Sequence, residues 1–168
     1  MQDNNPYSAP SAAVADIAPT GTRELAGRGM RLAAAIIDML ILLVILIPLM
    51  VMGGYFSGIM TGQQPGFGTQ LMWTAFGFVL FVLIQGYPLS QSGQTWGKKA
   101  LKMKIVDLDG HQPSLATLLG KRYLPVQAIS AVPVVGGLFG LVNVLFIFRE
   151  DRRCIHDLIA GTQVVVAD

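Results

Sequence analysis

One acid interrupts a long apolar run of this sequence. Asp38 lies eight residues beyond Met30, about 12 Å along a helix that begins there. An ionised carboxylate at that depth costs roughly 2.5–3.5 kcal/mol on insertion scales, so it must face protein or water and either pair or take up a proton. Two interpretations stay open: a cation or proton site, and a helix-packing residue that is hydrogen-bonded to a neighbouring helix.

Arg31 lies seven residues before Asp38, about two turns earlier on nearly the same helix face. The rise of about 10 Å between them makes direct pairing unfavourable. Arg31 is therefore either a topology anchor at the membrane interface or a fixed countercharge for a carboxylate from another segment. Asp157 could be that carboxylate, because it closely follows the last apolar run, at the level expected for Arg31.

His156 stands beside Asp157 and belongs to the residue type that titrates near neutral pH. It could relay protons or report cytoplasmic pH, although a lone histidine is more often a hydrogen-bonding residue. Asp38, Asp157 and His156 are thus the candidate ion- or proton-binding residues, with Arg31 as their charge partner.

Few uncharged polar side chains lie in or next to the apolar runs. Gln85, Asn143 and Thr95 could line a polar path across the membrane. They could instead make interhelical hydrogen bonds worth about 0.6 kcal/mol each, which is the more frequent role of a single such residue.

The sequence contains no recognisable enzyme constellation. It has no phosphate loop, no Cys-x-x-Cys, no HExxH and no GxSxG. Its two histidines are too few for a histidine-built metal site, and its single cysteine, Cys154, has no partner for a disulfide. We therefore expect no catalytic residues, no metal, no cofactor and no nucleic-acid partner.

The composition points to the lipid bilayer as the environment of these residues. Apolar residues make up 52% of the chain and charged residues 13%, whereas soluble domains contain about 25% charged residues. Two runs, over about 30–52 and 71–89, supply the roughly 20 apolar residues that a helix needs to cross the hydrocarbon layer. Residues 53–70 between them read as a Gly-rich loop without charge.

The uncharged stretch between Arg122 and Arg149 allows two interpretations. One helix of its 26 residues would be about 39 Å long and would cross once. Prolines and Gly136–Gly137 favour instead a hairpin of two short helices, over about 123–134 and 137–148. Basic residues precede the first run, cluster between the second run and the hairpin, and follow the hairpin, so the positive-inside rule requires an even number of crossings. The hairpin and two cytoplasmic termini satisfy this requirement.

Two segments outside the apolar runs have β-strand patterns. Residues 101–108 interleave apolar and charged side chains, and residues 162–167 form a second β-prone run, so the two could pair. Residues 1–25 read as a disordered cytoplasmic tail and 26–168 as the membrane domain. The predicted fold is an all-α membrane protein, a small helical bundle of two full spans plus a short C-terminal helical hairpin, to which a two-stranded cytoplasmic β-pair could be added.

Three passages resemble the RDD family of bacterial membrane proteins, which is named for one arginine and two aspartates. Residues 28–38 (RGMRLAAAIID) look like the first helix of the family, residues 93–110 like its central cytoplasmic motif, and residues 153–162 (RCIHDLIAGT) like its closing motif. The resemblance places the named residues on Arg31, Asp38 and Asp157. It implies transport of unidentified ligands, with cation/proton antiport proposed for some members.

Two functions follow as hypotheses, both for a multi-pass protein of the bacterial cytoplasmic (inner) membrane. The first is a small transporter or transport subunit in which Asp38 binds a cation or proton and Arg31 and Asp157 organise a cytoplasmic gate. Four apolar segments enclose a path poorly, so we expect a homo-oligomer or another membrane protein as partner within the bilayer. The second is a non-transporting scaffold or accessory protein in which these three residues are structural.

Overall fold

The structure is a computed structural model that describes residues 24–132 and 134–167. Two long helices dominate it, α1 (Arg28–Met52) and α3 (Phe67–Ser92), and both are long and apolar enough to cross a membrane. In the most apolar 18-residue window of each, 0% and 6% of the residues are buried inside the molecule. These helices therefore turn their apolar side chains outward, as lipid-facing helices do and core helices of soluble proteins do not.

The segment between the long helices differs from the predicted loop. It contains a short helix, α2 (Tyr55–Ile59), which follows Gly54 in the left-handed conformation at φ 72°. Glycine adopts this conformation without the steric cost that a side chain brings. The second long helix also begins four residues before and ends three residues after the predicted bounds 71–89.

The hairpin prediction is confirmed for the stretch between Arg122 and Arg149. Its first arm runs without a break through α5 (Leu115–Thr117), the π-helix η1 (Leu118–Tyr123) and α6 (Leu124–Ser130). Its second arm is α7 (Val135–Leu145) followed by the 3₁₀ helix η2 (Phe146–Phe148). A Cβ atom on Gly136 would lie 2.5 Å from the carbonyl oxygen of Ser130, so a glycine is needed where the arms meet.

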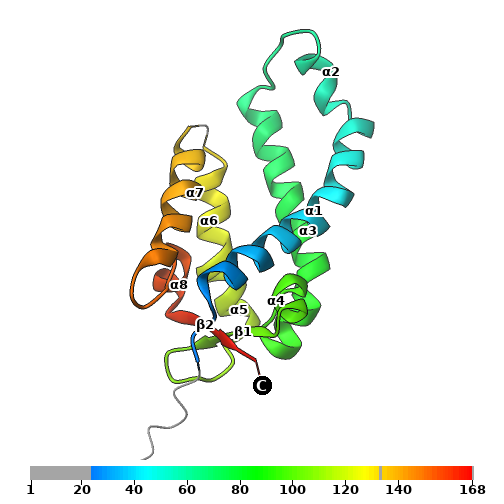
Figure 1. Cartoon of the computed structure of the whole chain (residues 1–168). Coiled ribbons are helices and arrows are strands. Elements are labelled where there is room, and N and C mark those ends of the chain that lie inside the picture. The colour runs from blue at the N-terminus through cyan, green and yellow to red at the C-terminus, as the bar shows by residue number, and fades with distance from the viewer. Residues whose placement is uncertain (1–23, 133, 168) are drawn as a thin grey trace, which may run out of the picture.

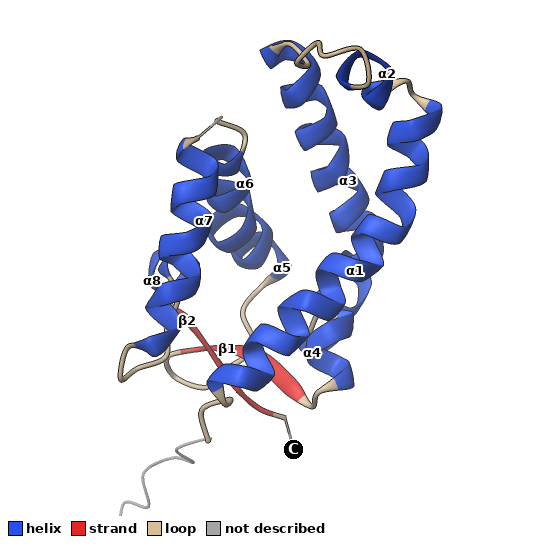
Figure 2. Cartoon of the chain, turned by 45° about the horizontal axis from the view of Figure 1, so that its top comes forward, coloured by secondary structure: helices blue, strands red, loops and turns tan. Residues whose placement is uncertain are grey.

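Four short elements lie together at one end of the molecule, and we call them the platform. They are α4 (Trp96–Ala100), β1 (Met103–Asp107), α8 (Ile155–Ala160) and β2 (Thr162–Val166). The predicted strand pair is confirmed as antiparallel, with Met103 opposite Val166 and Asp107 opposite Thr162. Figures 1 and 2 show the two strands crossing beneath the start of α1, on the opposite side of the molecule from α2.

The predicted tail over residues 1–25 lies outside the described residues except for its last two. Leu25 forms an isolated antiparallel bridge with Val165, and the carbonyl of Glu24 accepts a hydrogen bond from the amide of Val166. These two residues therefore belong to the folded part, because they extend the pairing of β2. The main buried cluster contains the strand residues Met103, Ile105 and Val164 together with Leu89 from α3 and Leu118 from η1.

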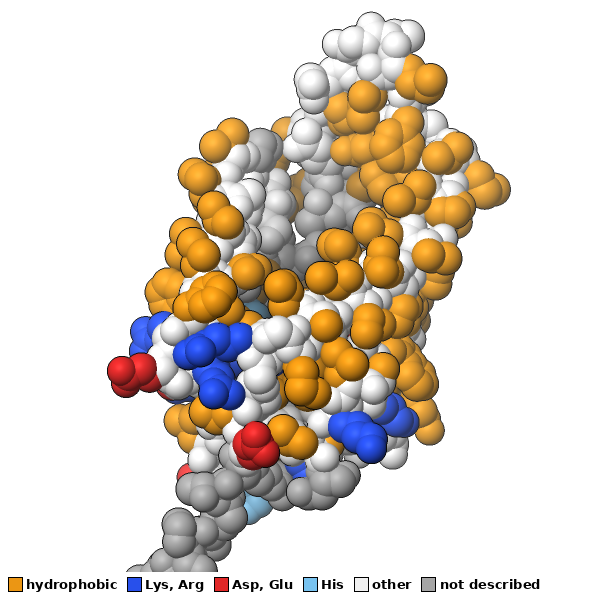
Figure 3. Space-filling model, in the orientation of Figure 1, with side chains coloured by type: hydrophobic (Ala, Val, Ile, Leu, Met, Phe, Trp, Pro, Cys, Tyr) orange, Lys and Arg blue, Asp and Glu red, His pale blue; other side chains and the backbone are white. Residues whose placement is uncertain are grey.

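The surface separates charge from apolar side chains. Figure 3 shows hydrophobic side chains over the body of the molecule, with Lys, Arg, Asp and Glu gathered at the platform end. No residue between Met39 and Gly97 is charged. The fold is thus that of a membrane protein with one charged end, and both candidate acids lie at or near that end.

Candidate functional site

Asp38 lies on α1 at the point where α4 packs against it. Its carboxylate accepts hydrogen bonds from the Gln85 amide at 2.9 Å, the Thr95 hydroxyl at 2.5 Å and the Gly97 backbone N–H at 2.8 Å. The Lys98 ammonium lies 4.0 Å away. The groups around this carboxylate that the structure describes are therefore all donors, drawn from α3 and from the start of α4.

The sequence around Thr95 explains how these donors are assembled. Thr95 is the N-cap of α4, in an extended conformation that directs its hydroxyl both to Asp38 and to the amide of Lys98. The Trp96 backbone N–H donates to the Gln85 side-chain oxygen at 2.9 Å, which orients the Gln85 amide so that its NH₂ group faces Asp38. Each donor is thus held by a second contact of its own.

Gly97 makes the close approach of α4 and α1 possible. A Cβ atom at this position would lie 2.3 Å from the backbone oxygen of Ala34 and 3.0 Å from the Asp38 side chain. Real Cβ atoms are essentially never found so close to backbone, so a side chain here would push α4 away from α1. Gly97 therefore has a steric role in the Asp38 site.

Asp157, the second acid, is fully buried between α1, η1 and α8. It forms ion pairs with Arg31, at 2.5 Å, and with Arg122. The Cys154 backbone N–H donates to it at 3.1 Å, as part of the capping box of α8, and the Thr162 hydroxyl lies at 3.4 Å. Of the two interpretations that the sequence leaves open for Arg31, this geometry favours the countercharge for a carboxylate from another segment, and that carboxylate is Asp157.

The electrostatics of this site favour a permanent negative charge on Asp157. Burial raises the pKa of the Asp157 carboxyl, but the guanidinium of Arg122, together with His156 and Arg31, holds that pKa well below its usual range. The two arginines and this aspartate therefore form a buried charged triad that joins α1, η1 and α8.

Sequence reasoning missed Arg122 as a member of this site, since it treated the residue only as a topology charge. The side chain is 1% exposed, and it also donates to the Thr162 hydroxyl at 2.6 Å. Its pairing depends on the fold, because Arg122 and Asp157 are 35 residues apart in the chain. The apolar run that Arg122 precedes predicts a helix start but gives no indication of its partner.

His156 lies next to the triad as a neutral hydrogen-bonding residue. Its Nδ1 lies 3.0 Å from the Asn143 side-chain oxygen, and its Nε2 lies 3.8 Å from Asp157. Burial, followed by the positive charge of Arg122, lowers the pKa of the imidazole to about 3. The imidazole therefore stays neutral at pH 7, which does not favour the proton-relay interpretation.

Cys154, His156 and Asp157 each offer one ligand atom, all within 4.8 Å of one another. A metal ion is nevertheless poorly accommodated there, because both Asp157 oxygens accept from guanidinium groups whose positive charge repels a cation. Burial raises the pKa of the Cys154 thiol, which keeps it protonated and weakly nucleophilic.

The predicted site residues form two separate groups. Asp38, Gln85 and Thr95 make one group, and Arg31, Asp157, His156 and Asn143 contribute to the other. Asp38 does not pair with Arg31 in either group, in agreement with the unfavourable spacing seen in the sequence. What the groups share is α1, which carries Asp38 in one and Arg31 in the other.

Comparison with known proteins supports the resemblance carried by these residues. The RDD family matches residues 25–161, a range that includes Arg31, Asp38 and Asp157. The chain is similar to YckC of Bacillus subtilis (strain 168), an uncharacterised protein, with 33% identity over 144 residues that cover 84% of this chain and 85% of YckC. No solved structure matches. The chain belongs to the RDD family.

Proposed function

We propose that this protein is a non-transporting membrane scaffold or accessory protein in which Arg31, Asp38 and Asp157 hold the platform against the membrane helices. The observation that carries this proposal is the surroundings of Asp38. Its carboxylate accepts from an amide NH₂, a hydroxyl and a backbone N–H, and an ammonium group lies 4.0 Å away. A bound Na⁺ or similar hard cation needs several oxygen ligands in place of these donors.

The oxygens closest to this carboxylate are already engaged. The Thr95 hydroxyl oxygen accepts from Lys98, and the Gln85 carbonyl oxygen accepts from Trp96. A cation would have to displace α4 from α1 in order to gain ligands at Asp38. The described arrangement is therefore suited to fastening two helices together.

The triad around Asp157 supports the same role by a second route. It links α1 through Arg31 and the hairpin through Arg122 to one residue of α8. Removing one partner of a buried ion pair costs on the order of 3–5 kcal/mol, because the remaining charge stays buried without compensation. Such pairs resist local opening of the segments that they join. This rigidity suits a scaffold, whereas a gate would have to break the pairs each time it opens.

The charge distribution supports an orientation in which the platform lies in the cytoplasm of a bacterial cell. Exposed bases at this end include Lys99, Lys102, Lys121 and Arg149, and residues 53–70 at the other end are uncharged. Basic residues in short loops favour the cytoplasmic side. The platform would then face anionic headgroups and present its outer surface to another membrane protein or a second copy of this chain.

Ion flux and thermal stability together test the proposal. In vesicles that contain the reconstituted protein and a pH-sensitive dye, gradients of Na⁺, K⁺ or Li⁺ should drive no more proton movement than in empty vesicles. Asp38→Leu should lower the unfolding temperature in detergent, because three donors lose their acceptor at about 1–3 kcal/mol each. Asp38→Asn should be milder, since its amide oxygen can still accept from Gln85 and Gly97.

The transport hypothesis expects a different pattern from the same variants. Cation-driven proton flux in the wild type, lost in Asp38→Asn without a change in unfolding temperature, would show that the carboxyl group acts through its charge and would refute the scaffold proposal. Asp109→Asn, an exposed acid in the turn after β1, serves as the control that should alter neither measurement.

A further inference from the structure

A cavity of about 460 Å³ lies between α1, α3 and the first arm of the hairpin, and at its inner end Phe81 and Tyr123 pack against the main buried cluster. Its walls are helical stripes. From α1 come Leu42, Leu46 and Met50, spaced four residues apart, and from α3 come residues spaced three and four apart between Gln70 and Phe81. The volume falls within the range of about 300–1,000 Å³ that is typical of small-molecule sites.

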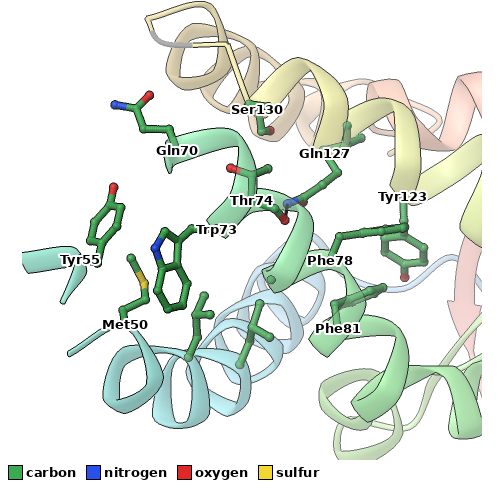
Figure 4. A pocket seen from close by; sticks show the side chains of 15 residues that line it. Met50, Tyr55, Gln70, Trp73, Thr74, Phe78, Phe81, Tyr123, Gln127 and Ser130 are labelled. Atoms are coloured by element: carbon green, nitrogen blue, oxygen red, sulfur yellow. Dashed lines mark hydrogen bonds between the residues drawn. The ribbon is translucent and has the colours of Figure 1, made fainter. Parts of the chain in front are cut away.

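The lining of this cavity defines the chemistry that it can accept. No lining residue is charged, so an ion would enter without a counterion. Figure 4 shows uncharged polar side chains along one wall, from Gln70 and Thr74 on α3 to Gln127 and Ser130 on α6. Aromatic and aliphatic side chains, among them Phe81, form the opposite and deeper part. The cavity is therefore amphiphilic but uncharged.

The length of the cavity suits an extended chain. Gln70 and Phe81 are eleven residues apart on α3, a distance of about 16 Å along the axis. A helix is about 10 Å across and would need a groove of that width along this whole length. A single extended hydrocarbon chain is much thinner, because its carbon atoms contact their neighbours at about 3.5–4.0 Å.

The position within the bilayer points to the source of such a chain. The length of about 16 Å is close to half of the roughly 30 Å hydrocarbon layer, which is the depth of one leaflet. Gln70 lies in the first turn of α3 and Ser130 is the last residue of α6. Both of these helix ends point away from the platform (Figure 1), to where the glycerol region of that leaflet would be. The apolar part extends from there towards the bilayer centre.

We propose that this cavity binds one acyl chain of a membrane lipid from the leaflet opposite the platform. The uncharged ester of the lipid accepts hydrogen bonds at the rim, from the Ser130 hydroxyl and from the Gln70 amide, whose NH₂ group also donates to the Pro65 backbone oxygen at 3.3 Å. The chain packs below it against the Leu42–Met50 stripe of α1 and against Phe81. This site is independent of the Asp38 and Asp157 contacts, and it stands whether or not the protein transports an ion.

Trp73 provides a fluorescent reporter inside the cavity. The sequence contains two tryptophans, and Trp96→Phe leaves Trp73 as the single one. In phosphatidylcholine vesicles with a fixed fraction of chains brominated at their middle, a chain in the cavity should quench Trp73 by contact. Cavity-filling Ala131→Phe should reduce this quenching. In native mass spectrometry with phosphatidylcholine, the parent protein should retain one lipid, and Ala131→Phe should lower the fraction of protein with a bound lipid about ten-fold or more.

Matched controls and a second filling variant make the test decisive. Ala128→Phe adds the same ring to an exposed position on α6 outside the cavity and should behave like the parent protein. Thr74→Phe fills the cavity from α3, with Ala75→Phe as its exposed control, in case one filling variant does not fold. Equal quenching and equal lipid retention in filling and control variants, or no retained lipid in any of them, would overturn the proposal.

Discussion

At the scale of single residues, each carboxylate is defined by what donates to it. Asp38 is held by neutral donors with a lysine nearby, and Asp157 by two guanidinium groups. An acid with its oxygens occupied in this way fixes neighbouring segments, because moving any of them leaves a polar group unpaired in a poorly hydrated region. Arg31, Asp38 and Asp157 thus belong to two separate contact sites that share α1.

His156 should make the protein less stable in mild acid. Its pKa is lowered to about 3 in the fold, compared with 6.5 for the free side chain, so the unfolded state binds more protons between these values. Stability is therefore fully present above about pH 6.5 and falls by up to about 1.4 kcal/mol for each pH unit below it. Thermal unfolding in detergent from pH 7.5 to 5 measures this loss.

A glutamine at position 156 provides the control for this prediction. It keeps a polar side chain that can bond to Asn143 but does not titrate, so His156→Gln should flatten the pH dependence over this range. Asp157 does not contribute to the same window, because its pKa lies below the usual value and its stabilisation is lost only in stronger acid. An equally steep loss in His156→Gln would show that another group is responsible.

At the scale of elements, the contact between α4 and α1 depends on one missing side chain. Gly97→Ala places a Cβ atom 2.3 Å from the Ala34 backbone oxygen, so α4 must shift and its hydrogen bond to Asp38 is strained. We expect a loss of about 1–3 kcal/mol, the usual range for overpacking. Gly140→Ala in α7, where nothing lies within 4 Å, is the matched control and should be neutral or slightly stabilising. Similar unfolding temperatures for both variants would argue against the close approach.

Elements with a strong local pattern could be predicted from the sequence. The two long helices, the hairpin and the strand pair follow from apolar length, breaking residues and alternation. Helices α4 and α8 were not foreseen, because five or six residues carry too little periodicity to distinguish a helical turn from a loop. Their N-cap residues, Thr95 and Cys154, can be recognised as part of the site only when the carboxylates that they contact are known.

The candidate site was predictable in part, for the same reason. An acid in an apolar run stands out because burying its charge in the membrane is unfavourable, and this identified Asp38. Asp157 was identified by its position after the last apolar run. Donors to these acids come from distant segments. Arg122 lies 35 residues from Asp157 along the chain, and Gly97 lies 59 residues from Asp38. Such long-range pairing is set by how α1, η1 and the platform pack, and a single sequence does not display it.

At the scale of the whole molecule, the account predicts a fixed orientation in the membrane. Cysteines introduced at the exposed positions Gln64 and Asp109 lie at opposite ends, and the native Cys154 is buried. A membrane-impermeant maleimide should label Gln64→Cys in intact bacterial cells and Asp109→Cys only after lysis. Labelling in the reverse pattern would place the platform outside the cytoplasm and contradict the positive-inside argument.

Hydrogen–deuterium exchange of the segment 93–101 tests most directly whether Asp38 fastens the platform to the membrane helices. Because the Gly97 N–H donates to Asp38, Asp38→Leu should speed exchange across α4 while peptides from α7 keep the wild-type rate, and Asp38→Asn should stay close to wild type. Unchanged exchange of this segment in Asp38→Leu would contradict the account, because α4 would then be held in place without the carboxylate.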